Sequence, residues 1–219
     1  MNILYITDNN IMGHGGGCLG ALKYYSAIKA YALKENANFK VISLGQNMPE
    51  AMDVEVVKNR NLDKSARLHG HSNFMYFIWK KNKNKIMALH PDVVLLGRTR
   101  LGFIAKEMKN SKPEIKIITF VDNIEYDYVD SYFSLAKGIK DNIFRQIEKR
   151  VVKNDEADAV NYSDRLIYLT HRDVQRCREL YHHVDSHEYI LPICLEHTCD
   201  LKIKSPLKTV AFVGSLGYG

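Results

Sequence analysis

The sequence contains no apolar run long enough to cross a membrane and no recognisable leader peptide. Nothing in it approaches the ~18 to 20 uninterrupted apolar residues of a membrane-spanning helix. Only a few apolar residues precede Asp8, and they have neither a basic flank nor a cleavage site. The N-terminus therefore predicts a strand rather than a signal peptide, and we expect a cytoplasmic protein.

Motifs for binding metals are also missing. The chain has four cysteines, which are Cys18, Cys177, Cys194 and Cys199. They include no C-x-x-C pair and have no histidine at a fixed spacing, so reduced thiols in the cytoplasm are the favoured interpretation. His182, His183 and His187 have no carboxylate or cysteine at a metal-ligand spacing. We therefore expect surface histidines and no metal site.

The composition is that of an ordinary soluble enzyme domain. Hydrophobic residues make up 46% of the chain and charged residues 26%, and 219 residues suffice for one large α/β core. The formal net charge of +6 favours anionic partners, among them nucleotide phosphates, an acidic membrane surface and nucleic acid. Charge alone does not choose among these partners.

Short apolar, β-branched runs alternate with longer helical patterns along the chain. The expected strands are residues 3–7, 39–44, 54–57, 93–96, 115–121, 166–169 and 188–191. The expected helices are residues 19–33, 74–89, 102–109, 139–151 and 171–181. This alternation predicts an α/β fold with a doubly wound, mostly parallel, Rossmann-like sheet covered on both faces. The polar, turn-rich stretch 45–72 is expected to be a surface excursion.

The end of the chain repeats the organisation of its beginning. Residues 209–213 form an apolar run that meets Gly214, as residues 2–7 are followed by the glycines of residues 13–17. A single strand cannot bury itself, so the repeat predicts that a second domain begins here. The expected boundaries are a first domain at 1–191, a linker at 192–206, and the first strand and glycine turn of a truncated second domain at 207–219.

A glycine-rich loop follows the first expected strand. Residues 15–20 satisfy G-x-G-x-x-G, a weak pattern by itself. In a dinucleotide enzyme the first glycine follows the strand almost at once, and an acidic residue ends the next strand. Here Asp8 to His14 intervene, and the next strand ends in Gly45-Gln46. The loop is better suited to the close approach of a ligand diphosphate that binds mainly to other residues. We expect Gly16 to adopt a positive φ. The alternative is a turn that binds no ligand.

Charged side chains follow two further expected strands. Residues 115–121 run directly into Asp122, Asn123 and Glu125, and Arg98 and Arg100 come just after residues 93–96. Ligands of open α/β sheets bind outside the carboxyl ends of the strands. Asp122 and Glu125 are therefore candidate acid/base or hydroxyl-binding groups, and the two arginines are candidates for binding an anionic or hydroxylated acceptor. The alternatives are capping or solvated acids and a solvated arginine loop.

Four features in this order resemble the N-terminal half of glycosyltransferase family 4. They are the delayed Gly15-Gly16-Gly17 loop, the segment Phe120-Val-Asp-Asn-Ile-Glu125-Tyr, the run Asp164-Arg-Leu-Ile-Tyr-Leu-Thr-His-Arg-Asp173, and Leu191-Pro192 before a linker to Val210-Ala-Phe-Val-Gly214-Ser-Leu. Together they span nearly the whole chain.

The resemblance implies one half of a two-domain GT-B architecture and a retaining sugar transfer from a nucleotide-sugar to a saccharide or lipid-linked acceptor. The N-terminal domain would hold the acceptor and would be inactive alone. Gly15, Gly16, Gly17 and Gly214 would meet the donor phosphates. Asp122 and Glu125 would be the catalytic candidates, and Arg98, Arg100 and Asn123 would bind the acceptor. No cofactor is implied, since the nucleotide-sugar is a substrate.

One residue departs from the family pattern. The family commonly has a histidine where this chain has Asp122. An aspartate accepts a hydrogen bond from a sugar hydroxyl equally well, but an ionised aspartate cannot donate one. This departure leaves the role of Asp122 open.

Three other interpretations remain at this point. Aromatic residues 74–79 and the lysine-rich residues 80–85 would suit peripheral contact with the inner face of a membrane, or the apolar residues pack on the sheet. A nucleotide-dependent oxidoreductase or epimerase is disfavoured by the missing ribose acid. A basic nucleic-acid-binding domain is disfavoured because the cations are scattered and form no recognised motif.

Overall fold

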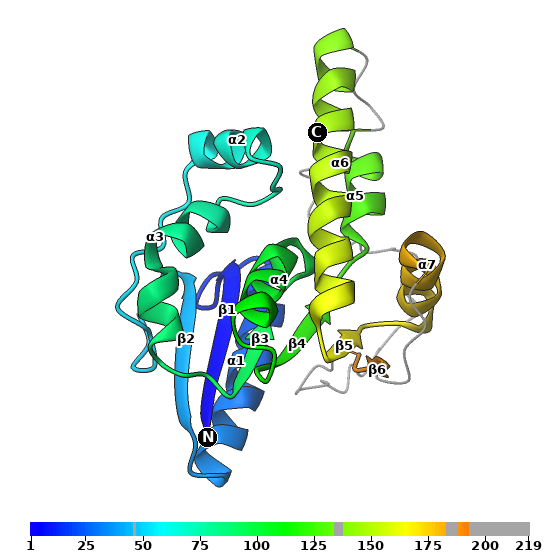
Figure 1. Ribbon diagram of the computed structural model, residues 1–219. Coiled ribbons are helices and arrows are strands. Elements are labelled where there is room, and N and C mark those ends of the chain that lie inside the picture. The colour runs from blue at the N-terminus through cyan, green and yellow to red at the C-terminus, as the bar shows by residue number, and fades with distance from the viewer. Residues whose placement is uncertain (46, 134–137, 183–187, 193–219) are drawn as a thin grey trace, which may run out of the picture.

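The fold is a six-stranded parallel sheet with helices on both faces, as a computed structural model describes it for residues 1–45, 47–133, 138–182 and 188–192 (Figure 1). The strand order is β2-β1-β3-β4-β5-β6. The bounds are β1 Asn2–Asn10, β2 Asn38–Leu44, β3 Val93–Leu96, β4 Lys116–Val121, β5 Arg165–Tyr168 and β6 Glu188–Ile190. The predicted doubly wound α/β fold is confirmed. Gly214 and the predicted second-domain segment at 207–219 lie outside the described residues.

The helices connect successive strands. Their bounds are α1 Gly16–Lys34, α2 Arg60–Leu68, α3 Met75–Met87, α4 Gly102–Ser111, α5 Glu125–Tyr132, α6 Ile139–Tyr162 and α7 His171–Tyr181, with a 3-10 turn η1 at Thr99–Leu101. Figure 1 shows α6 rising past the carboxyl edge of the sheet with α5 beside it, while α2 stands across from them. The carboxyl edge therefore lies between α2 and the α5–α6 pair.

The core has two layers because strand side chains alternate between the faces of the sheet. Ile3 and Tyr5 of β1 pack in the cluster that contains the buried face of α1. Leu4 and Ile6 pack on the other face with residues of α3 and α4. A third cluster joins β5 to α7 and to the end of α6.

The predicted strand at 54–57 is wrong. Only an isolated bridge, between Val41 and Ala51, joins this part of the chain to the edge of β2. Val54 and Val56 are buried in the core, whereas Val57 is exposed. The alternating valines are therefore explained by side-chain packing without a paired backbone, and the described sheet has six strands instead of about seven.

Two helices were missed and one was predicted too short. Stretch 45–72 is not only a surface excursion, because it contains α2, whose Asn59 side chain accepts a hydrogen bond from the backbone of Asn61 as an N-cap. α5 begins directly after the acidic segment, and α6 continues to Tyr162. α5 and residues 152–162 of α6 contain many polar and charged residues, so their apolar periodicity is weak.

Four of the six side chains at 74–79 pack in the core, as the second interpretation of this segment predicts. Phe74, Met75, Ile78 and Trp79 are all buried, and the indole of Trp79 donates to Glu107. These four side chains cannot contact a bilayer without unfolding the domain. Among the described residues, no helix combines the length and the apolar character needed to traverse a membrane.

Candidate functional site

The candidate site lies at the carboxyl ends of β1, β3 and β4. The chain passes from β1 to β2 on one side and then returns to add β3 on the other side, so the strand order reverses between β1 and β3. Ligands of open α/β sheets bind outside such a point. The glycine loop follows β1, Arg98 and Arg100 follow β3, and Asp122 to Glu125 follow β4.

The glycine loop forms the N-terminus of α1. Gly15 is the N-cap residue with φ −83°, and Gly16 is already helical, so the predicted positive φ at Gly16 is wrong. A Cβ at Gly17 would lie 3.0 Å from Nη2 of Arg98, whereas one at Gly16 would meet nothing within 4 Å. Gly17 therefore packs closely against Arg98, and Gly15 and Gly16 leave the first backbone amides of α1 open to a ligand.

Asp122 lies beside the helix that follows this loop. The Tyr24 hydroxyl, on α1, donates to Asp122 Oδ1 at 3.0 Å, and the Tyr24 ring stacks on Phe120 with centroids 3.8 Å apart. Burial raises the pKa of Asp122, against the lowering effects of the Tyr24 hydrogen bond and of the Arg98 charge. The structure thus brings Asp122 and α1 together, whereas Asn123 is exposed to solvent.

Glu125 and Arg100 are buried partners and not solvated loop residues. Arg100 Nε donates to Glu125 Oε2 at 2.7 Å, and Arg100 Nη1 donates to Glu148 Oε1 at 2.9 Å. Arg67 of α2 also pairs with Glu148. Burial lowers the pKa of Arg100, but the neighbouring carboxylates of Glu125 and Glu148 outweigh it and hold the pKa above its ordinary value. We call these four residues the arginine–glutamate network.

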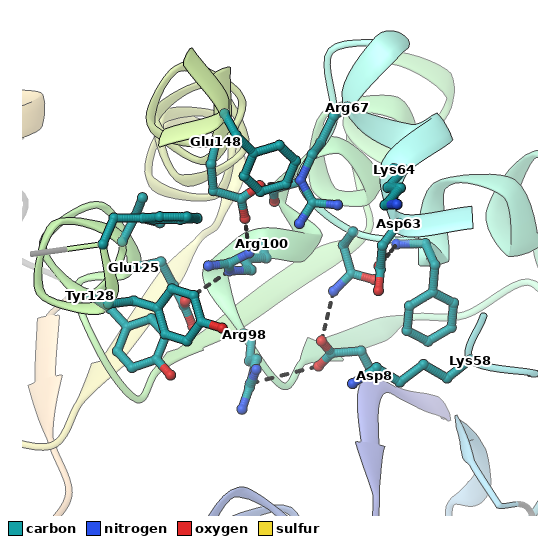
Figure 2. A pocket seen from close by; sticks show the side chains of 17 residues that line it. Asp8, Lys58, Asp63, Lys64, Arg67, Arg98, Arg100, Glu125, Tyr128 and Glu148 are labelled. Atoms are coloured by element: carbon teal, nitrogen blue, oxygen red, sulfur yellow. Dashed lines mark hydrogen bonds and ion pairs between the residues drawn. The ribbon is translucent and has the colours of Figure 1, made fainter. Parts of the chain in front are cut away.

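Arg98 points away from Arg100 and toward the end of β1 (Figure 2). Its Nε lies 3.7 Å from Asp8 Oδ1, and Asp8 Oδ2 accepts a hydrogen bond from Asn73 Nδ2 at 2.7 Å. Its Nη2 lies next to Gly17, at 3.0 Å from where a Cβ would be. The guanidinium of Arg98 therefore lies between the glycine loop and the arginine–glutamate network. The two predicted arginines therefore have different surroundings.

A pocket of about 450 Å³ opens between α2 and the α5–α6 pair. Its charged lining residues are Asp8, Lys58, Asp63, Lys64, Arg67, Arg98, Arg100, Glu125 and Glu148. Its aromatic lining residues are Phe74, Tyr128, Tyr132, Phe133 and Phe144. Figure 2 shows Tyr128 and Glu125 on one side of the pocket and Lys64 and Arg67 on the opposite side. Aromatic rings and paired polar groups converging in one cavity are typical of a small-molecule site.

Carboxylates of α6 hold the surrounding loops in place. Glu156 accepts from the backbone N–H groups of Glu125 and Tyr126 and from the hydroxyls of Thr99 and Tyr181. It thereby caps the N-terminus of α5. Burial raises the pKa of Glu156 to about 7, although the four donors favour its ionised form.

Asp155 of the same helix fixes the other wall of the pocket. It accepts from both the backbone N–H and the hydroxyl of Ser72 at 2.7 Å, and it bonds His71 Nδ1 at 2.9 Å. These bonds tie the segment that follows α2 to α6. One helix therefore positions both walls.

Sequence reasoning missed several residues of this site. Asp8, Arg67, Asn73 and Glu148 line the pocket, yet none of them belongs to a local motif. Arg67 and Glu148 are 81 residues apart in the chain. The charge periodicity of α6 was the only available signal, and it did not indicate a partner.

No metal centre accompanies these groups in the part of the chain that the structure describes, because no cluster of three or more histidine, cysteine, aspartate or glutamate side chains there has a suitable arrangement. A comparison with protein-family models finds no match to this chain. A comparison with curated proteins finds none either. The fold and the geometry of the site are therefore the features that bear on function.

Proposed function

We propose that this domain is the acceptor-binding half of a retaining glycosyltransferase that moves a sugar from a nucleotide-sugar to a hydroxyl of a saccharide or lipid-linked acceptor. The observation that carries the proposal is the position of Arg98. On one side of it lie the open amides of the glycine loop, and on the other side lies the pocket with its rings and paired charges. Two binding places that share a boundary suit a reaction between two substrates.

The glycine-loop side is the proposed place of the donor diphosphate. Gly15 and Gly16 present backbone N–H groups at the start of a helix, where a developing negative charge is stabilised. Arg98 adds a cation beside Gly17. We therefore assign Arg98 to the phosphates as well as to the acceptor, while most of the donor contacts belong to another domain.

Asp122 is proposed to orient a hydroxyl of the donor sugar or of the acceptor. Its carboxylate is fixed by Tyr24 and lies on the glycine-loop side. Glu125 is a less suitable catalytic group, because Arg100 and the arginine–glutamate network already engage it. We propose a positioning role for Glu125.

The geometry favours this proposal over a nucleotide-dependent oxidoreductase or epimerase. Such enzymes use an acidic residue at the end of the second strand to bind a ribose. Here β2 ends at Leu44 and is followed by Gly45, where a Cβ would lie 2.9 Å from the Asn10 side chain. An acidic residue at position 45 would have to adopt the positive φ of Gly45, +68°, and displace the Asn10 side chain.

The test is a product assay on the protein expressed from its complete reading frame. A panel of nucleotide-sugars is incubated with neutral saccharides, and the products are detected by mass spectrometry, with the anomeric configuration determined by NMR. We expect transfer with retention, and we expect Asp122→Ala to lower turnover at an unchanged melting temperature. Asp53→Ala removes an exposed carboxylate paired only with Lys85 and is the matched control. Hydride transfer, or no transfer with any donor, would contradict the proposal.

Gly16→Val tests the donor side separately. A Cβ at Gly16 would meet nothing within 4 Å, so we expect the fold to tolerate the substitution, while the branched atoms of valine would cover the amides of α1. We expect the KM for the donor to rise more than the KM for the acceptor. Equal effects on both would remove the glycine loop from the donor site.

A further inference from the structure

The pocket beside the arginine–glutamate network is lined by side chains of two kinds. Rings come from Tyr128 and Tyr132 of α5, from Phe133 after it, from Phe144 of α6 and from Phe74 before α3, and the centroid of the Phe144 ring lies 5.2 Å from Arg67 Cζ. Charged groups, among them Glu125, Arg100 and Arg67, lie between these rings (Figure 2). Its volume of about 450 Å³ falls within the roughly 300–1,000 Å³ of small-molecule sites. Such a cavity suits a ring with one apolar face and several polar edges.

The buried charges of the pocket compensate one another. Arg67 and Arg100 are matched by Glu125 and Glu148, whose side chains are 5% and 6% exposed. Arg98 is matched only loosely by Asp8, because its Nε lies 3.7 Å from Asp8 Oδ1 and neither atom makes a hydrogen bond with the described residues. Beside Glu125 and Glu148, the two guanidinium groups of Arg67 and Arg100 are therefore already paired with carboxylates.

The remaining charged groups belong to the rim. Asp63 accepts from the backbone N–H of Phe74 at 3.1 Å. Lys58 and Lys64 are exposed to solvent. Because exposed charges are screened by water and contribute about 1 kcal/mol or less per pair, the two lysines would hold an anion only weakly.

This balance decides which ligand chemistry fits. Beside the arginine–glutamate network, a ligand carboxylate or phosphate would lose its water and become an additional anion next to Glu125 and Glu148, where Arg67 and Arg100 are already paired. Hydroxyl groups have no such cost, since they donate to the carboxylate oxygens and accept from the guanidinium N–H groups. The C–H face of a sugar ring would pack on an aromatic side chain of the lining.

We propose that the pocket receives an uncharged, hydroxyl-rich sugar ring, so that the receiving end of the acceptor is a neutral sugar and not a uronic acid or a sugar phosphate. This inference rests on the proposed function and specifies its acceptor class. It concerns the ring in the pocket and not groups farther along the acceptor.

Matched pairs of methyl glycosides test the inference on the 219-residue chain. Methyl glucoside, galactoside and mannoside differ from the corresponding methyl uronides only at C6, where a hydroxymethyl group replaces a carboxylate. Saturation-transfer NMR and titration give a Kd for each probe. We expect at least one neutral glycoside to bind, with its uronide at least about tenfold weaker.

Charge-changing variants localise the effect. Glu148→Gln leaves Arg67 and Arg100 facing Glu125 alone, so the preference for the neutral member of the pair should shrink or reverse. Glu125→Gln makes the same charge change and serves as the second variant if Glu148→Gln melts early. Lys64→Gln alters only the rim and should leave the preference unchanged.

Aromatic variants test the packing of the sugar ring. Phe144→Ala should weaken the binding of the neutral glycoside, whereas Tyr31→Ala, at an exposed ring of α1 outside the pocket, should not.

Two results overturn the inference. If a uronide binds as tightly as its neutral partner or more tightly, the acceptor is acidic, although a glycosyltransferase remains the proposed function. If neither series binds, the pocket is not a sugar site, and the transferase proposal is then judged by its product assay. A third result also contradicts the inference. If Glu148→Gln and Glu125→Gln both leave the preference for the neutral glycoside unchanged, the arginine–glutamate network does not cause that preference.

Discussion

On the glycine-loop side of Arg98, the chain offers backbone amides and one hydrogen-bonded carboxylate, whereas on the pocket side the buried charges belong to ion pairs that join three distant segments. The glycine loop of the first side is local, because α1 follows β1 almost directly, although Asp122 is 98 residues from its donor Tyr24. The second side exists only after α2, η1 and α6 have packed together. The difference teaches that the glycine-loop side can be altered without unfolding the domain, while the pocket side is part of its stability.

A substitution at the base of the pocket side should have the largest effect. A Cβ at Gly102 would fall inside the backbone of Asp155 and Ala159, where α4 crosses α6. We expect Gly102→Val to destabilise the fold by at least about 3 kcal/mol, as measured by urea denaturation. Gly16→Ala on the glycine-loop side meets nothing within 4 Å and should be nearly neutral. Equal losses for both variants would break the comparison.

The two arginines after β3 should also differ. Arg100→Met leaves Glu125 without its guanidinium and Glu148 with only Arg67, which should cost about 3–5 kcal/mol of unfolding free energy because a buried charge loses its partner. Arg98→Met removes a looser pair at 3.7 Å and should cost about 1 kcal/mol. Chemical denaturation of both variants gives the values. A larger cost for Arg98→Met would reverse our ordering of the two sides.

The stability of the pocket side should depend on pH through Glu156. Its pKa is about 7 in the folded protein, against an ordinary value of 4.5 for a glutamate side chain. Between these values the folded state keeps a proton that the unfolded state has lost, so this contribution to the free energy of unfolding falls as the pH rises.

Measurement against Glu156→Gln isolates that contribution. The stability of the wild type relative to the variant should drop by roughly 1–3 kcal/mol between pH 4.5 and pH 7. Thermal melts of both proteins across this range provide the measurement. A flat difference would show that the four donors keep Glu156 ionised throughout.

The smallest effect is expected at the hydrogen bond from Tyr24 to Asp122. Tyr24→Phe should cost about 1 kcal/mol and raise the pKa of Asp122 further, because the carboxylate loses a donor. Carboxyl ¹³C NMR titration measures the pKa. Tyr25→Phe is the control, since Tyr25 donates to Glu50 instead. No difference between the two variants in the pKa of Asp122 would mean that this bond does not position Asp122.

The sequence predicted what neighbouring residues determine. Five of the predicted helices and six of the predicted strands have counterparts, and Asp122 was placed at the correct strand end. The segments that failed lack a local signal. Val54 and Val56 alternate like a strand but are buried without pairing, and α2 is so polar that only its Asn59 cap marks it.

The pocket could not be predicted for the same reason. Glu148 belongs to the pocket because it pairs with Arg67 and Arg100, which lie 81 and 48 residues away in the chain. A charged residue on a polar helix is solvated in most proteins. Only the packing of α6 on η1 and α2 shows that Glu148 is buried and paired.

Mapping two ligands onto the two sides tests the central claim most directly. Backbone and side-chain NMR shifts of the 219-residue chain are recorded with a nucleotide-sugar and, separately, with a neutral methyl glycoside. We predict that the nucleotide-sugar binds more weakly than about 10 μM and shifts Gly15, Gly16 and Asp122, while the glycoside shifts Tyr128 and Phe144. Arg98 should respond to both ligands. The claim of two adjoining sites would be contradicted if both ligands shifted the same residues on both sides of Arg98. It would also be contradicted if the nucleotide-sugar bound tightly within the pocket.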